Sequence, residues 1–231
     1  MSHKQTHHEP VVDNGAVAVE KARDFWAANG KTITIGLAVL LVIVGGFWAY
    51  KHFVVAPKER EALDKSFMAE EYFKQDSFAL ALNGDGINQG FAKLADRYSG
   101  TSTGNLSNYY AGVCCIKLNQ NDKAVKYLEK FSTNSKLIQQ RAYKLLGDAY
   151  GDLGKGDKAL DFYKKAAHHF EEDEAASAEA LFNAAFLAQT VLNKPDEAKK
   201  LFRELKDKYP RTQQGFEADK YLAELGEFNA N

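Results

Sequence analysis

Two patterns of apolar residues divide the chain. Residues 32–50 contain no charged side chain, whereas from residue 62 onward apolar residues recur three and four positions apart among charged ones. At 1.5 Å per residue, the uncharged run forms a helix roughly 28 Å long, which matches the hydrocarbon thickness of a bilayer. The second pattern is typical of amphipathic helices. The sequence therefore predicts one membrane-spanning helix followed by an all-α domain.

The uncharged run has the flanks of an uncleaved signal anchor. Trp26, Trp48 and Tyr50 lie near its ends, where amphipathic rings favour the membrane interface. A buried core helix is one alternative, but the run reaches the length expected of a span. A cleavable signal peptide is another, opposed by the long leader, the long apolar run and the lack of a small-residue cleavage site after Tyr50. We expect a polar tail at 1–31, the anchor at 32–53 and a linker at 54–61.

The domain after the anchor contains a repeated helical hairpin. Between residues 141 and 166, residues of fixed size and spacing match the tetratricopeptide repeat (TPR) pattern: Leu146, Gly147, Tyr150, Ala159, Tyr163 and Ala166. A similar unit runs from Ala111 to Phe131, and a third runs from Ala184 to Pro210. A fourth, divergent unit is indicated by the parallel of Phe91, Leu94, Tyr98 and Thr101 with Phe202, Leu205, Tyr209 and Thr212.

Helical hairpins of this kind stack into a solenoid, because one hairpin cannot bury its apolar face alone. The predicted fold is all-α: a single N-terminal transmembrane helix, then a TPR α-solenoid of about four helical pairs with a C-terminal capping helix. The TPR domain should fill residues 62–231. Its units are expected at about 62–101, 105–138, 140–173 and 178–211, with the capping helix at 212–228.

Composition and motifs argue against an enzyme and against nucleic-acid binding. The chain has 30 Lys and Arg against 31 Asp and Glu, without the basic surplus that phosphate contacts require. The glycine-rich run 151–157 lacks the spacing of a phosphate-binding loop and falls at a repeat turn. Cys114 and Cys115 are expected to be buried as small apolar side chains. The histidines and acids of residues 168–174 favour a solvated linker over a metal site, and no cofactor, metal or small-molecule substrate is expected.

The anchor region resembles a known family. Phe25, Trp26, Asn29, Gly30 and Lys31 directly precede the span, and a repeat domain without an attached enzyme follows it. This arrangement is similar to the YfgM-like family, the ancillary subunit of the SecYEG translocon. Lys and Arg are nearly balanced across the span, so charge alone leaves its orientation open.

The resemblance implies a single-pass protein of the bacterial inner membrane, with a cytoplasmic N-terminus and a periplasmic TPR domain. Its implied partners are translocon subunits, periplasmic chaperones or secreted clients. The function expected is that of a non-enzymatic, membrane-anchored adaptor. The alternative is a scaffold for outer-membrane, cell-wall or division machinery, because the Tyr-Pro-x-Thr segment before the last helix looks like that of envelope-assembly TPR proteins.

TPR domains generally bind ligands along the first helix of each pair, at the second, fifth, ninth and twelfth repeat positions. In this sequence those positions predict a protein-binding groove with an apolar lining and a charged middle. The carboxylate clamp of chaperone-binding TPR domains is incomplete, since Asp148 stands at the ninth position. Alternatively, Phe182 and Phe186 pack against a neighbouring helix, or the terminal helix fills the groove. The predicted groove residues are Leu106, Tyr109, Val113, Ile116, Arg141, Lys144, Asp148, Glu179, Phe182, Phe186 and Gln189.

Overall fold

The computed structural model describes residues 14–227, which are helical except for short turns and one isolated β-bridge between Gly84 and Gln89. Two compact units divide the chain between residues 54 and 55. The first part of the expected polar tail, residues 1–13, lies outside the described residues. The remainder of that expected tail is helical.

The first unit consists of one long helix and most of a π-helical turn. Helix α1 spans Asn14–Tyr50, and η1 spans Lys51–Val55. The helical run Val19–Lys74 is long and apolar enough to cross a membrane, a test that an N-terminal signal sequence also passes. No residue of its apolar window is buried within the described structure. The length and composition of this segment are compatible with a membrane anchor.

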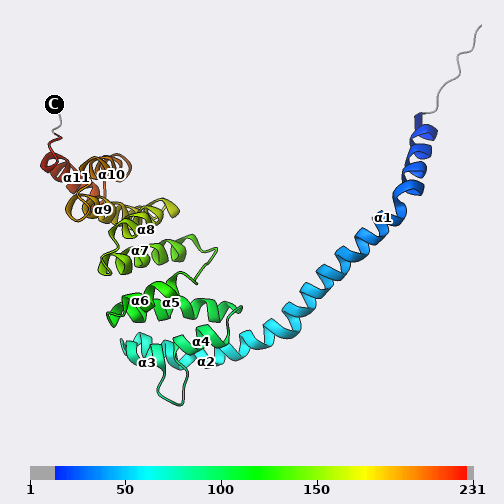
Figure 1. The fold of residues 1–231 in the computed structure, drawn as a ribbon, viewed down its shortest axis with the longest axis horizontal. Coiled ribbons are helices and arrows are strands. Elements are labelled where there is room, and N and C mark those ends of the chain that lie inside the picture. The colour runs from blue at the N-terminus through cyan, green and yellow to red at the C-terminus, as the bar shows by residue number, and fades with distance from the viewer. Residues whose placement is uncertain (1–13, 228–231) are drawn as a thin grey trace, which may run out of the picture. The chain divides into compact units, whose positions relative to one another are not determined.

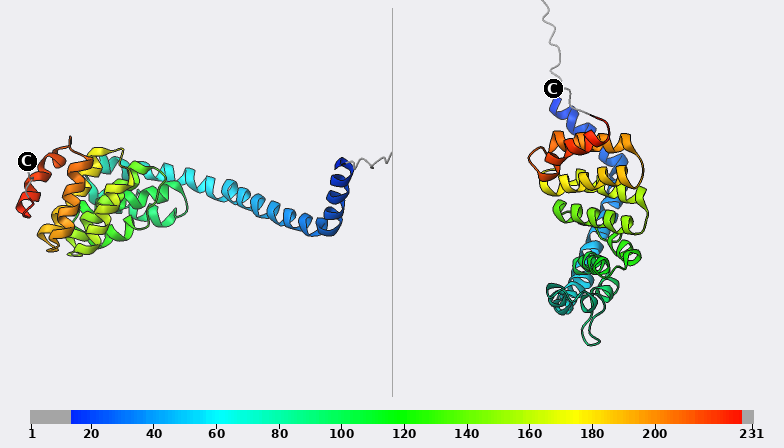
Figure 2. Two further views of the ribbon diagram at one scale, coloured as in Figure 1. Left: turned by 90° about the horizontal axis from the view of Figure 1, so that it is seen from above. Right: turned by 90° about the vertical axis from the view of Figure 1, so that its left-hand side faces the viewer.

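The second unit is a stack of helices (Figures 1 and 2). Antiparallel pairs follow one another along the chain, and each pair packs on the next. The linker expected at residues 54–61 lies in helical backbone, in η1 and the start of α2. The helices are α2 (Ala56–Lys74), α3 (Phe78–Asn83), α4 (Phe91–Arg97), α5 (Ser102–Lys117), α6 (Asn121–Leu128), α7 (Lys136–Asp152), α8 (Gly156–His169), α9 (Glu174–Thr190), α10 (Pro195–Lys208) and α11 (Gln213–Glu224).

Small residues let the two helices of a pair approach closely. A Cβ added to Gly112 would lie 2.5 Å from Leu128 Cγ, and one added to Gly147 would lie 2.5 Å from Tyr163 Cδ1. Both glycines therefore form holes that a large side chain of the second helix fills. The expected burial of Cys114 and Cys115 is confirmed, since both are fully buried as free thiols.

Two junctions between successive helical pairs of the second unit are built in the same way. Thr101 caps α5: its hydroxyl donates to the Tyr98 carbonyl at 2.7 Å and accepts from the Gly104 N–H at 3.0 Å. Thr212 caps α11 in the same manner, through Tyr209 and the third residue of that helix. These caps satisfy N–H groups that a helix start otherwise leaves unpaired. The sequence parallel between the two segments is therefore a structural repeat, and α11 corresponds to the first helix of a pair.

Candidate protein-binding groove

The first helices of successive pairs pack side by side. Helix α5 contacts α2 and α7, and α9 contacts α7 and α11. All predicted groove residues lie on α5, α7 and α9, and we call the surface that they form the groove. It divides into an apolar end on α5, a charged middle on α7 and the start of α9, and an aromatic end on the rest of α9.

The apolar end carries four predicted residues with different degrees of exposure. Leu106 is 37% exposed, whereas Tyr109, Val113 and Ile116 are half-buried. The ring of Tyr109 packs 5.2 Å from that of Phe131, and burial raises the pKa of its hydroxyl. Tyr109 and Ile116 also pack against the hydrophobic core. This end therefore offers a partly ordered apolar surface rather than flexible side chains.

The charged middle is an ion-pair network that joins two units. Lys144 Nζ lies 3.1 Å from Asp148 Oδ2 on its own helix and 3.2 Å from Glu179 Oε1 on α9. Tyr163 donates its hydroxyl to Asp148 at 2.9 Å. Burial lowers the pKa of Lys144, but attraction to the two carboxylates outweighs it and holds that pKa above its ordinary value. One ammonium group is thus shared by two carboxylates, and the network retains one negative charge.

Arg141 lies beside this network. Its side chain is exposed and forms no salt bridge within residues 14–227. Together with Lys144, Glu179 and the buried Gln140 it lines a cleft of about 310 Å³. Asp173 also lines the cleft, so two basic and two acidic side chains face it and its net charge is zero. Arg141 is its basic group that forms no salt bridge in the described structure, and it could therefore pair with an acidic group of a ligand.

The aromatic end is partly covered by the terminal helix. Phe182 packs edge-on against Tyr221 of α11, with ring centroids 5.3 Å apart, and against Phe202 at 6.0 Å. Phe186 stacks on Phe182 at 6.0 Å and remains 43% exposed. Phe186 also packs edge-on against Tyr221, at 6.1 Å, so both phenylalanines contact the neighbouring helix α11. Helix α11 therefore covers part of this end and leaves part of Phe186 exposed.

A second cleft joins the charged middle to the aromatic end. It has a volume of about 330 Å³, and Asp148, Tyr163 and Phe186 are among its lining residues. Gln189, the last predicted residue, is half-buried, and its side-chain oxygen accepts no hydrogen bond in the described structure. Of the predicted residues, the structure thus brings Lys144, Asp148 and Glu179 into one network. Leu106 lies on α5, outside this network.

Comparison with known proteins agrees with this architecture. Residues 179–212 match the family model described as tetratricopeptide repeat. The solved structure of a Podosopora anserina protein, described as a kinesin light chain with nearly identical TPR-like repeats, superimposes with a TM-score of 0.52. It is 13% identical and covers 73% of this chain and 86% of its own. A single-substitution variant of that protein superimposes equally well, over 85% of its length. A comparison with curated protein sequences gave no match.

The second unit has the fold of a TPR-like α-solenoid, called the TPR solenoid below. TPR folds are typically non-enzymatic scaffolds for protein–protein interaction, and the repeat match indicates this class of function. The expected fold class, with one long apolar N-terminal helix before the solenoid, is confirmed.

The first helix of the TPR solenoid carries two exposed apolar residues that the sequence patterns did not identify. Leu63 and Phe67 lie one turn apart on α2 and are 61% and 60% exposed. They flank Ser66, which is buried with Ala62 and Ala69 on the inner side of the helix. The indicative pattern was the i, i+4 apolar pair beside a stripe of small residues. The pair forms an exposed apolar patch on α2, a helix that packs against α5.

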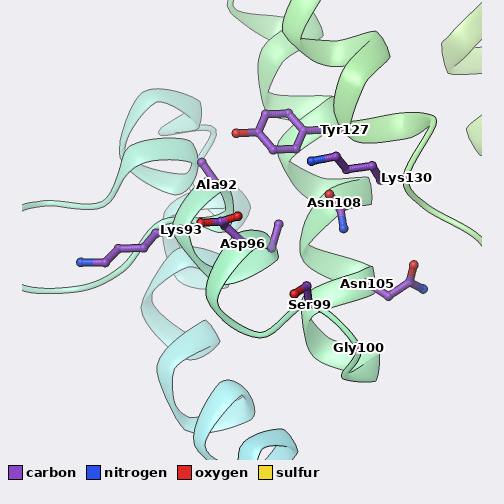
Figure 3. A pocket seen from close by; sticks show the side chains of 10 residues that line it. Ala92, Lys93, Asp96, Ser99, Gly100, Asn105, Asn108, Tyr127 and Lys130 are labelled. Atoms are coloured by element: carbon purple, nitrogen blue, oxygen red, sulfur yellow. The ribbon is translucent and has the colours of Figure 1, made fainter.

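Another pocket of the solenoid lies away from the groove. It has a volume of about 760 Å³ and is formed by α4, α5 and the end of α6, and no predicted groove residue lines it. Figure 3 shows Tyr127, Lys130 and Asn108 on one side of this pocket and Asp96 on the other. Most of its lining side chains are polar or charged.

His168, in the segment 168–174 that was expected to be a solvated linker, lies close to a carboxylate of helix α10. His168 Nε2 lies 2.8 Å from Glu204, and donor atoms of His168, Glu171 and Glu204 all fall within 4.8 Å of one another. Lys208 lies 2.9 Å from Glu171 and 3.0 Å from Glu204, so its ammonium already supplies the positive charge at this position. The arrangement is that of a surface ion-pair network between α8 and α10.

Proposed function

We propose that this protein is a membrane-anchored TPR adaptor that binds segments of other proteins in the groove. The observation that carries the proposal is the groove itself. It has exposed apolar residues at both ends, represented by Leu106 and Phe186, and an ion-pair network between them. Surfaces that combine apolar contact positions with a few fixed polar groups are typical of peptide recognition.

The partner chemistry follows from the lining. Apolar side chains of a bound segment would contact the two ends, where aromatic rings supply large contact areas. An acidic side chain or a C-terminal carboxylate would pair with Arg141, which forms no salt bridge within residues 14–227. The bound segment should therefore carry apolar residues on both sides of one negative charge.

The cellular setting is part of the same proposal. Helix α1 would act as the anchor, with the N-terminus in the cytoplasm and the TPR solenoid in the periplasm of a bacterial inner membrane. The partners would be subunits of the Sec translocon, periplasmic chaperones or secreted clients. The residues before the span that resemble the YfgM-like family, Phe25 to Lys31, support this choice.

Site-specific photo-crosslinking of the full chain in its membrane tests the groove and the partner separately. A photoreactive amino acid at Leu106 or Phe186 should give adducts with partner proteins, whereas the same group at the exposed Lys126 of α6 should not. Arg141→Glu should lower the adduct yield at both groove positions. Equal adducts at all three positions would reject the groove.

Mass spectrometry of the adducts tests the translocon assignment. Enrichment of translocon subunits or secreted chains would support it. An outer-membrane, cell-wall or division complex without any translocon subunit would reject that assignment and leave the groove intact. Protease added to spheroplasts should digest the TPR solenoid, and protection of the solenoid would reverse the proposed orientation.

A further inference from the structure

Helix α11 has the structure of a first helix whose second helix is absent from residues 14–227. Its cap repeats that of α5, and the stacking on the preceding unit is repeated as well. Tyr110 of α5 stacks on Phe91 at 5.0 Å with ring planes 19° apart, and Tyr221 of α11 stacks on Phe202 at 4.9 Å and 5°. The alignment that makes Thr101 equivalent to Thr212 therefore also makes Tyr110 equivalent to Tyr221, so it holds along both helices.

In the pair that begins with α5, the second helix, α6, covers one face of α5. Leu128 of α6 fills the hole at Gly112, and Asn105 bonds to Ser132, just beyond α6, through its amide at 2.8 Å and 3.2 Å. These two α5 residues are seven positions apart, so they share one face of the helix. This face is the one that a first helix presents to its partner.

In α11, the equivalent positions are Phe216 and Ala223. Phe216 is 85% exposed, although the rest of the helix buries its apolar side chains against α9 and α10. Ala223 stands where Gly112 forms the hole in α5. The open face of α11 thus carries a large apolar knob and a small residue two turns later, and no helix of the described part of the chain covers it.

We propose that this face pairs with the same face of a second copy of the chain. In an antiparallel two-fold arrangement, Phe216 of each copy enters the hole at Ala223 of the other. The same pairing brings Lys220 of each copy towards Asp219 of the other, whose side chain is 52% exposed and already lies 2.6 Å from Lys206 of its own copy. The apolar knob, the small residue that receives it and these charges all lie on one helix, which makes the surface self-complementary, as a two-fold interface requires. This contact uses none of the groove residues on α5, α7 and α9.

Cross-linking of the full chain in mild detergent tests the register. A mixture of Phe216→Cys and Ala223→Cys proteins should form a disulfide between the two variants under oxidation. The native thiols do not interfere, because both are fully buried. A mixture in which Phe67→Cys replaces Phe216→Cys should give no such product. Equal yields from both mixtures would overturn the proposal.

Sedimentation equilibrium of the same detergent-solubilised chain tests the energetics. Phe216→Ser should raise the dissociation constant of the dimer at least tenfold, because it removes the central apolar contact. Phe67→Ser, at a comparably exposed aromatic on α2, should leave the constant unchanged. Circular dichroism should show both variants folded, since neither side chain is buried. A monomer at tens of micromolar, or a dimer that Phe216→Ser does not weaken, would refute the proposal, and capture of a different protein by α11 would replace it.

Discussion

Replacing Gly147 by alanine should destabilise the α7–α8 pair although alanine favours helices. The added Cβ would lie 2.5, 2.6 and 3.0 Å from ring atoms of Tyr163. Contacts this short require one of the two groups to move. Tyr163 is held by its hydrogen bond to Asp148, so its ring cannot shift without breaking a bond that belongs to the groove network.

The magnitude follows from two opposing terms. Overpacking of a filled site costs about 1–3 kcal/mol, whereas glycine to alanine inside a helix gains about 0.5–1 kcal/mol. The midpoints of these two ranges give a net loss of about 1.3 kcal/mol. In a domain of this size, 1 kcal/mol shifts the melting temperature by about 2–4 °C, so Tm should fall by about 3–5 °C.

Thermal unfolding of the full chain in detergent, followed by circular dichroism, measures the effect. Gly151 provides the matched control one turn later on α7, because a Cβ there meets nothing closer than 3.9 Å. Gly151→Ala should therefore raise Tm slightly. The packing argument fails if Gly147→Ala is as stable as the parent protein, or if the two substitutions shift Tm in the same direction.

Three further outcomes follow from individual contacts. Burial raises the pKa of Cys114 to about 12, so Cys114 and its neighbour Cys115 should resist alkylation at pH 8 until the protein unfolds, which mass spectrometry can follow. Lys164 lowers the pKa of Glu197 through a 2.6 Å bond. Glu197→Gln should therefore cost about 0.2–1 kcal/mol at pH 7 and progressively less as acid protonates the native carboxylate, visible as converging Tm values. Thr212→Ala removes the cap of α11, which should cost about 1 kcal/mol and speed hydrogen exchange in that helix first.

The sequence pattern predicted the helices because the repeat fixes residue size at contact positions. Gly112 and Gly147 stand where a second helix approaches, and both meet the large side chain that the pattern implies. The parallel of Phe91 with Phe202 is also confirmed, by equivalent stacks on Tyr110 and Tyr221. These features are local or repeat at a fixed period, so they can be predicted from one sequence.

Other features depend on contacts between units and escaped prediction. The salt bridge between Lys144 and Glu179 joins two residues that lie 35 positions apart in the sequence, on α7 and α9. The repeat pattern contains no signal for it. The first unit was aligned through its second helix only, so the exposed Leu63 and Phe67 of α2 were missed. The expected linker at 54–61 is helical, because its residues continue the run from α1 into α2 without a glycine.

The ion network has a consequence for how the groove selects partners. Lys144 is held between Asp148 and Glu179, so an incoming segment must break two short contacts to recruit its charge. Arg141 is the charge of the predicted groove that can be engaged without such loss. Affinity should then come mainly from the apolar ends, and added salt should weaken binding only by the screening of about one exposed ion pair. A steep salt dependence of partner binding would place the contact on another, more highly charged face of the solenoid.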